Sequence, residues 1–181
     1  MTGELEIIHG MQSLLVTDWS RGAVVFASRY LVFLFVPLIA GLGYIRKRFP
    51  LRQAVTDAGW SALLALFTTN ILGQLVGRFR PYEASSEIMR LIPSPLTVHA
   101  FPSGHTAVAF ACAAALTLGS PAWGMVALVL ATGVGVGRVF AGVHYPSDVV
   151  AGAVLGILCA IVIRWMRVAN TVRKSKKSTN H

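Results

Sequence analysis

The stretch Arg138–Asp148, which reads RVFAGVHYPSD, joins two apolar segments that are each long enough to cross a bilayer. The first segment runs from about 122 to 140 and the second from 146 to about 165. A transmembrane helix needs about 20 mostly apolar residues, so both segments fit. The arginine and the histidine between the segments would then lie at a membrane surface, where charged groups usually have a partner. This stretch predicts a polar site at one end of a helical membrane bundle.

Three further apolar segments predict spans at about 23–44, at about 54–76 and, in a shorter form, at 104–118. Residues 3–16 carry apolar residues at helical spacing and predict an interfacial amphipathic helix or a frayed terminus. The chain is 55% hydrophobic and only 13% charged, whereas soluble domains are roughly 25% charged. We therefore expect an all-α integral membrane protein, a helical bundle of five to six transmembrane or interfacial helices that forms a single domain over residues 1–181.

The net charge of +9 comes mainly from two clusters that flank apolar segments. Ten of the sixteen basic residues lie at 46–52 and at 164–177. Such clusters mark cytoplasmic ends of spans and leave no soluble basic face for nucleic acid. Five spans with an outside N-terminus satisfy both clusters, which makes residues 167–181 a basic cytoplasmic tail. The loops at 78–101 and 141–145 then face outward, so all the polar motifs described below share one membrane face.

A histidine and a carboxylate stand at the start of the last predicted span. Pro146 favours the first turn of a helix, which places His144 on the preceding loop and Asp148 in that first turn. A carboxylate there can fix the tautomer of the imidazole and leave the other ring nitrogen free to attack. The alternative is an ordinary acidic residue that stabilises the positive end of the helix dipole.

The tetrapeptide Pro102-Ser103-Gly104-His105 precedes the short apolar segment. Ser103 is a favourable N-cap, and the free N–H groups of Ser103 and Gly104 can bind an anion. His105, one residue further on, can protonate a leaving oxygen. A simple helix cap beside an interfacial histidine remains the alternative.

Two arginines at the ends of spans, Arg80 and Arg138, are suited to hold phosphate because a guanidinium can donate two parallel hydrogen bonds. His105, His144 and Asp148 could also ligate zinc or iron. The neighbouring arginines would repel such a cation, so we predict no metal and no other cofactor.

These residues resemble the type 2 phosphatidic acid phosphatase family. Its pattern is a Lys, six intervening residues and Arg-Pro, then Pro-Ser-Gly-His, then Ser-Arg, five residues, His, three residues and Asp. The chain matches this pattern at the same spacings with Arg80-Pro81, with the 102–105 tetrapeptide, and with Arg138, His144 and Asp148. The family Lys falls at Gly73 and the family Ser falls at Gly137. Gln74 or Arg78 could supply the phosphate contact that the lysine makes, with headgroup contact as the alternative for Arg78.

The resemblance implies a metal-independent phosphatase with a six-helix core, in which residues 3–16 would supply the sixth helix. His144 would be the nucleophile, Asp148 its orienting partner and His105 the acid, while Arg80, Arg138, Ser103 and Gly104 would bind the phosphate. The chain is also similar to undecaprenyl pyrophosphate phosphatases of the bacitracin-resistance type, which carry segments like Ile8-His9-Gly10, Arg80-Pro81-Tyr82 and Leu91-Ile92-Pro93.

We therefore expect hydrolysis of a lipid pyrophosphate, undecaprenyl pyrophosphate first, at the outer face of a bacterial cytoplasmic membrane. The expected partners are this substrate and membrane lipids. Phosphatidylglycerophosphate, phosphatidic acid and lipid A phosphate are alternative substrates for the same residues. A non-catalytic membrane scaffold is the further alternative.

Overall fold

A computed structural model describes residues 3–45, 49–93 and 99–178, and these residues form helices and loops without a β-strand. The basic residues at 46–48 lie outside the described residues. The predicted all-α fold is confirmed. The helices, in chain order, are α1 (Gly3–Ser13), α2 (Asp18–Arg29), the short 3-10 helix η1 (Leu31–Leu34), α3 (Phe35–Ile45), α4 (Phe49–Val76), α5 (Pro81–Ala84), α6 (Gly104–Gly119), α7 (Pro121–Phe140) and α8 (Pro146–Ser178).

Within the described residues, α4, α7 and α8 are each long and apolar enough to cross a membrane, and the bent pair formed by α2 with η1 and α3 would be a fourth span. The chain is therefore a multi-pass membrane protein. α6 is shorter, with 16 residues, but it is the most buried helix of the bundle core. Proline stands at the first position of α7 and of α8, where its missing N–H costs no hydrogen bond.

The first predicted span, 23–44, is not one continuous helix. α2 begins earlier, at Asp18, because Thr17 and Ser20 form a reciprocal capping box. The chain then bends by 52° at the break between α2 and the helix that follows it. Hydropathy alone could not show this bend, since the apolar run continues through it. The bend leaves Val32 and Phe33 beside a cavity that also contains the polar motifs.

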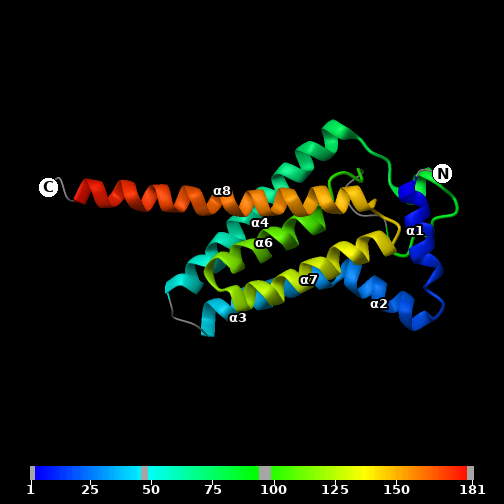
Figure 1. The fold of residues 1–181 in the computed structure, drawn as a ribbon, viewed down its shortest axis with the longest axis horizontal. Coiled ribbons are helices and arrows are strands. Elements are labelled where there is room, and N and C mark those ends of the chain that lie inside the picture. Colours follow the sequence, from blue (N-terminus) through cyan, green and yellow to red (C-terminus); the bar gives the residue numbers. More distant parts are fainter. Residues whose placement is uncertain (1–2, 46–48, 94–98, 179–181) are drawn as a thin grey trace.

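α6 packs against α4, α7 and α8, and this packing builds the main core (Figure 1). The α6–α8 contact depends on two glycines in α8. A Cβ atom added at Gly152 would lie 2.6 Å from the Ser103 carbonyl oxygen, and one added at Gly156 would overlap the Ala107 carbonyl oxygen. Small residues let helix backbones approach closely in lipid. They bring the start of α8 against the start of α6.

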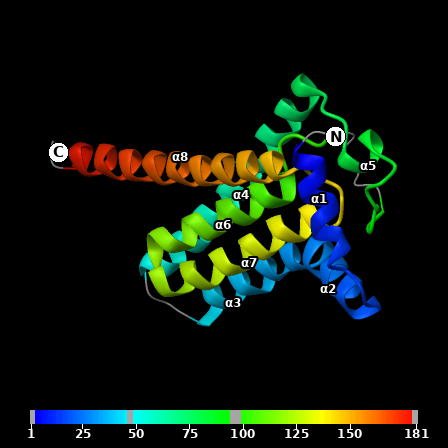
Figure 2. The same cartoon turned by 45° about the vertical axis from the view of Figure 1, so that its right-hand side comes forward.

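α1 lies at the same end of the bundle as α2 and α5 (Figure 2). The predicted helix at 3–16 ends at Ser13, and its buried face is formed by Leu5, Ile8 and Gln12. The Gln12 amide donates to the Met89 and Phe140 carbonyl oxygens at 2.7 and 3.0 Å. α1 is thus attached to the loops that surround the polar motifs.

α8 continues well beyond the predicted end of its span and forms one helix to Ser178 (Figure 1). Its 33 residues correspond to about 50 Å at about 1.5 Å per residue, which exceeds a hydrocarbon core of about 30 Å. On the C-terminal half of this helix, Arg167 Nε donates to Asp57 Oδ1 of α4 at 2.5 Å. The basic tail therefore begins as a helical extension that an ion pair fixes to the bundle.

Candidate active site

The three polar stretches of the sequence meet at one end of the bundle beside a cavity of about 660 Å³. Residues of the stretches 102–105 and 138–148 line it, whereas Arg80 does not line it and reaches its wall through the His99 carbonyl oxygen at 3.1 Å. The ends of α4 and α7, the beginning of α6 and the loop before α8 supply its polar part. The predicted site residues on its wall are Gln74, Gly104, His105, Arg138 and His144. The structure thus brings together residues that are as far apart in sequence as 74 and 144.

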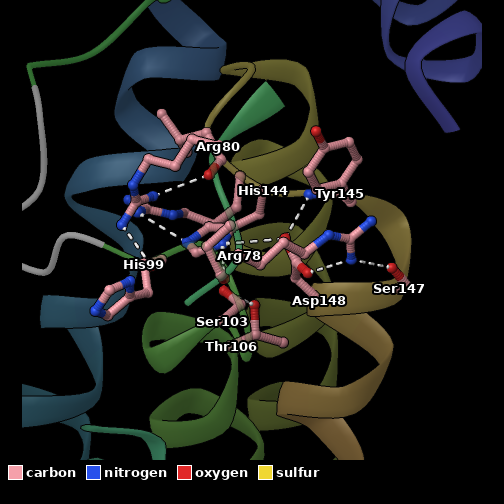
Figure 3. Close-up of polar contacts among 12 residues, drawn as sticks. Arg78, Arg80, His99, Ser103, Thr106, His144, Tyr145, Ser147 and Asp148 are labelled. Atoms are coloured by element: carbon pink, nitrogen blue, oxygen red, sulfur yellow. Dashed lines mark hydrogen bonds and ion pairs between the residues drawn. The ribbon is translucent and has the colours of Figure 1, made fainter. Parts of the chain in front are cut away.

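His144 lies on the loop between α7 and α8, as predicted, and it is only 2% exposed. Its Nδ1 atom lies 2.7 Å from the carbonyl oxygen of Ala100 (Figure 3). A carbonyl oxygen can only accept, so Nδ1 carries the proton, and the lone pair of Nε2 accepts from Arg138 Nη2 at 3.3 Å. Burial lowers the pKa of His144 from 6.5 to about 4, with the neighbouring arginines acting in the same direction. The ring is therefore neutral at physiological pH, and its Nε2 atom can act as a nucleophile.

Asp148 lies in the first turn of α8, but its contact with His144 differs from the predicted one. The carboxylate oxygen Oδ2 is 3.7 Å from His144 Nδ1, too far for a hydrogen bond. This oxygen instead accepts the Tyr145 N–H at 2.8 Å. The nearer Ala100 carbonyl oxygen fixes the tautomer of the imidazole. The buried Asp148 holds the loop that carries the ring, and its negative charge lowers the electrostatic potential at the imidazole.

Ser103 occupies the N-cap position of α6 without forming the predicted cap. Its hydroxyl pairs with Thr106 Oγ1 at 2.9 Å, and its N–H donates to the Asp148 carbonyl oxygen at 3.0 Å. The N–H groups of Gly104 and His105 precede the first intrahelical bond, which Ala107 donates to Ser103. The first N–H groups of a helix lack helical partners and attract anions. This predicted anion site therefore starts at Gly104 rather than at Ser103.

The two arginines predicted to hold phosphate are both buried, with 1% exposure for Arg80 and 2% for Arg138. Arg80 Nη1 donates to the Val143 carbonyl oxygen at 2.9 Å, so Arg80 braces the loop just before His144. Arg138 Nη2 lies 3.3 Å from His144 Nε2, and Nη1 donates to the Ser28 carbonyl at 3.2 Å. The Arg138 Nε atom has no hydrogen-bond partner among the described residues. An unpartnered buried donor next to a nucleophile is suited to a phosphate oxygen.

Arg78 does not line the cavity, so its predicted contact with phosphate is corrected. Its guanidinium extends toward Asp148 and Ser147, away from the Arg80 guanidinium (Figure 3). It donates to Asp148 Oδ1 and to Glu4 Oε2, both at 2.7 Å. Two carboxylates therefore occupy Arg78. Glu4, on the N-terminal helix, was not predicted, because nothing in the sequence signals contact between residues 4 and 148.

Two other cavity residues, His99 and Arg29, were also missed. His99 stands three residues before Pro102 of the Pro-Ser-Gly-His motif, and Arg29 is the last residue of α2. A histidine so near a phosphate motif is a signal that the sequence offered. The position of Arg29 depends on the bend after α2, which the sequence did not show.

In the described part of the chain, no group of three or more His, Cys, Asp or Glu side chains is arranged to hold a metal ion. The site combines a neutral histidine, a second histidine, buried guanidinium groups and a helix N-terminus. These groups can bind and polarise an oxyanion and can attack its central atom.

The chain belongs to the PAP2 superfamily, whose family model matches residues 54–171. This is the family that the motifs resemble, and the match includes every predicted site residue. The N-terminal helices that supply Glu4 and Arg29 lie before the matched region.

Named relatives extend this assignment. The chain is 36% identical to the bacitracin transport permease protein BcrC of Bacillus licheniformis over 58% of its own length and 53% of that protein. It is 30% identical to an undecaprenyl-diphosphatase of Sulfolobus acidocaldarius over 75% of its length and 65% of that protein. The chain thus aligns with about half to two thirds of these relatives. The crystal structure of Aquifex aeolicus LpxE superposes with a TM-score of 0.67 and 26% identity, covering 88% of this chain and 93% of that one.

Proposed function

We propose that this protein is a membrane lipid phosphatase that removes the terminal phosphate of a lipid pyrophosphate, with undecaprenyl pyrophosphate as the foremost substrate. One observation carries the proposal. His144 is held with its Nδ1 proton on the Ala100 carbonyl, and its Nε2 atom faces Arg138 in a cavity that includes the start of α6. A nucleophile and phosphate-binding donors thus share one enclosed space.

In the first step, His144 Nε2 attacks the terminal phosphorus. A nitrogen–phosphorus bond forms while the bond between phosphorus and the bridging oxygen breaks, which gives a phosphohistidine and a lipid phosphate. The developing imidazolium is stabilised by the Ala100 carbonyl at 2.7 Å and by the Asp148 carboxylate at 3.7 Å. Asp148 thus acts through charge and loop position rather than through a direct hydrogen bond.

The charge on the equatorial oxygens is met by Arg138, through its unpartnered Nε atom, and by the N–H groups at the start of α6. Arg80 contributes its positive charge while its carbonyl contacts keep the His144 loop in place. His105 lies on the same buried wall as Arg138. The negative charge of the bound phosphate allows this ring to hold a proton, which it then gives to the leaving oxygen. Water then attacks the phosphorus and gives a proton to His105 while the nitrogen–phosphorus bond breaks. This step releases inorganic phosphate and returns neutral His144 and protonated His105 for the next cycle.

The shape of the cavity supports a lipid substrate. Its wall continues from the polar end past apolar side chains of η1, α4 and α6, namely Val32, Phe33, Leu66 and Val108. Phe33 and Leu66 are also exposed on the outside of the bundle, at 62% and 48%. A prenyl chain can therefore extend from the phosphate toward the bilayer interior. The relative named undecaprenyl-diphosphatase supports an isoprenoid pyrophosphate as the first choice.

We further propose that the chain works as one domain in a bacterial cytoplasmic membrane, with the site on the outer face and the C-terminus inside. The support is the distribution of charge. The site and the basic end of α8 lie at opposite ends of the bundle (Figure 1), and basic clusters favour the cytoplasmic side. No metal enters the proposed mechanism.

The test is phosphate release by protein purified in detergent, with chelator present, on undecaprenyl pyrophosphate, phosphatidylglycerophosphate, phosphatidic acid and lipid A. We expect the prenyl pyrophosphate to give the highest kcat/KM and His144→Ala to abolish release. His9→Ala, a change at an exposed histidine on α1, is the matched control and retains activity. A higher kcat/KM on a glycerolipid or on lipid A would replace the substrate. Undiminished release by His144→Ala would overturn the mechanism.

A further inference from the structure

The wall of the cavity contains one histidine to which the proposed mechanism assigns no role. His99 precedes α6 and lies on the wall together with His105, His144 and Arg138. Its neighbour across the cavity wall is Gly73 of α4, the position at which the family pattern has lysine. A Cβ atom added at Gly73 would lie 3.7 Å from His99 Cβ and 3.9 Å from His99 Cδ2. The imidazole therefore stands against the place from which a lysine side chain would extend.

The backbone around His99 is held by residues of the site itself. The His99 carbonyl oxygen accepts from Arg80 Nη2 at 3.1 Å, and the Ala100 carbonyl oxygen accepts from His144 Nδ1 at 2.7 Å. The Ala100 N–H in turn donates to the Arg78 carbonyl at 2.8 Å. These three bonds fix residues 99 and 100 relative to the nucleophile. The backbone from which the His99 side chain extends is therefore held against the site.

We propose that His99 is a substrate-binding residue that donates a hydrogen bond to the phosphate from the position that lysine serves elsewhere in the family. The inference rests on the proposed phosphatase site and names one more of its phosphate contacts. It assigns this role to a residue outside the three family motifs.

The other candidates for this role fit the structure less well. Arg78 is occupied by Asp148 and Glu4. Gln74 also lines the cavity, but its amide is neutral, whereas an imidazole can bring a positive charge to a phosphate. Of the two described residues that a Cβ atom at Gly73 would meet, Phe101 and His99, only His99 can do so.

The space at Gly73 allows a lysine at position 73 to take the place of the imidazole at position 99. The nearest atom to an added Cβ is the Phe101 carbonyl oxygen at 3.4 Å, an ordinary contact distance. Truncation of His99 to alanine removes the ring that lies beside this position. A lysine introduced by Gly73→Lys in a His99→Ala protein therefore has room to reach the cavity. If the role is a phosphate contact, the double variant regains what the single variant loses.

The experiment measures binding of orthovanadate and of inorganic phosphate to the purified protein by calorimetry, so it does not depend on turnover. A hydrogen bond to a charged group contributes enough that we expect His99→Ala to weaken binding about tenfold to hundredfold. His9→Ala, on exposed α1, should bind like the wild type, and the double variant Gly73→Lys with His99→Ala should recover most of the loss. Thermal unfolding of each protein shows whether the folded bundle is retained.

Unchanged anion binding by His99→Ala would overturn the proposal. A loss of anion binding that Gly73→Lys fails to restore would also overturn the proposal, if the double variant unfolds at the same temperature as His99→Ala. The loss of binding would then come from a structural role of His99 and not from a contact with phosphate. Anion binding that follows the expected pattern in a protein that releases no phosphate from any lipid would support the His99 contact and overturn the proposed function. The two failures are therefore distinguishable.

Discussion

Restoring the family serine at Gly137 should damage this protein rather than improve it. A Cβ atom added at Gly137 would lie 2.9 Å from the Ser28 backbone nitrogen and 3.0 Å from Ala27 Cβ. Favourable contacts between such atoms need about 3.5 Å or more, so α2 would have to move by about half an ångström. Both close atoms belong to the body of α2, where no flexible side chain can turn aside. Gly137 thus lets α2 pack directly on α7.

The cost follows from this geometry. Over-packing in a tightly packed interior destabilises by about 1–3 kcal/mol. For a chain of this size, each kcal/mol lowers the melting temperature by about 2–4 °C, which gives a fall of about 2–12 °C for Gly137→Ser. Activity should fall as well, because the Ser28 carbonyl oxygen accepts from Arg138 Nη1 at 3.2 Å and moves with α2.

The assay is thermal unfolding and phosphate release of Gly137→Ser in the same detergent as the wild type. Gly59→Ser is the matched control, because a Cβ atom at Gly59, in the helix α4, would meet nothing within 4 Å. We expect the control to unfold with the wild type. A Gly137→Ser protein that unfolds with the control and keeps full activity would refute the reasoning.

Three further results follow from the structure. Because the pKa of His144 in the substrate-free protein is lowered to about 4, protonation of His144 should not reduce kcat/KM between pH 7 and pH 5. An acid limb above pH 6 that the ionisation of the substrate does not explain would argue against a neutral nucleophile. The same shift contributes stability above pH 6.5 that is lost as the pH falls to about 4, roughly 3 kcal/mol measured as the pH dependence of unfolding. Arg78→Ala leaves the buried Asp148 without its cation and should lower the free energy of unfolding by about 3–5 kcal/mol. Glu4→Gln changes a partly exposed pair and should lower it by about 1 kcal/mol or less. Equal unfolding temperatures of the two variants would contradict this order. Asp57→Asn should lower the unfolding temperature without changing KM, because it loosens α8 from α4 far from the cavity, and a changed KM would show coupling to the site.

The sequence predicted the helices well because hydropathy and capping act locally. The segment expected at 104–118 ends one residue before α6 ends, and the segment expected at 122–140 begins one residue after α7 begins. Pro121 and Pro146 mark helix starts, and both lie at the first position of a helix in the structure. These features depend on neighbouring residues alone, so a single sequence contains them.

The bend between α2 and α3 and the full length of α8 depend on information that hydropathy does not contain. Apolar residues continue through the bend at Tyr30, so a window average sees one span. The end of α8 is polar and helical at once, and the sequence pattern indicated only its charge. The bend places Val32 and Phe33 on the wall of the cavity. The length of α8 shapes the end of the bundle opposite the site (Figure 1).

The site shows the same division. Motif spacing brought His105, Arg138 and His144 together correctly, because each motif stands at the end of a span. It did not show which acceptor holds the imidazole. The Ala100 carbonyl takes this place because the loop before α6 passes between Arg80 and His144, and a backbone carbonyl leaves no trace in the residue type.

The assignment of Arg78 was wrong for a related reason. Proximity along a helix suggested that its side chain could replace a lysine one turn away. Residues 77–80 leave the helix after Val76, and Gly77 adopts a φ of 61° that turns the chain away from the axis of α4. Arg78 therefore reaches Asp148 and Glu4 rather than the cavity.

The central claim is that His144 becomes covalently phosphorylated during turnover. The most direct measurement is rapid acid-free quenching of the purified protein with undecaprenyl pyrophosphate labelled on its terminal phosphate, followed by peptide mapping. We expect an acid-labile label on His144 that forms and disappears during turnover and that His144→Ala lacks. Label on another residue, or turnover of the lipid by His144→Ala, would contradict it.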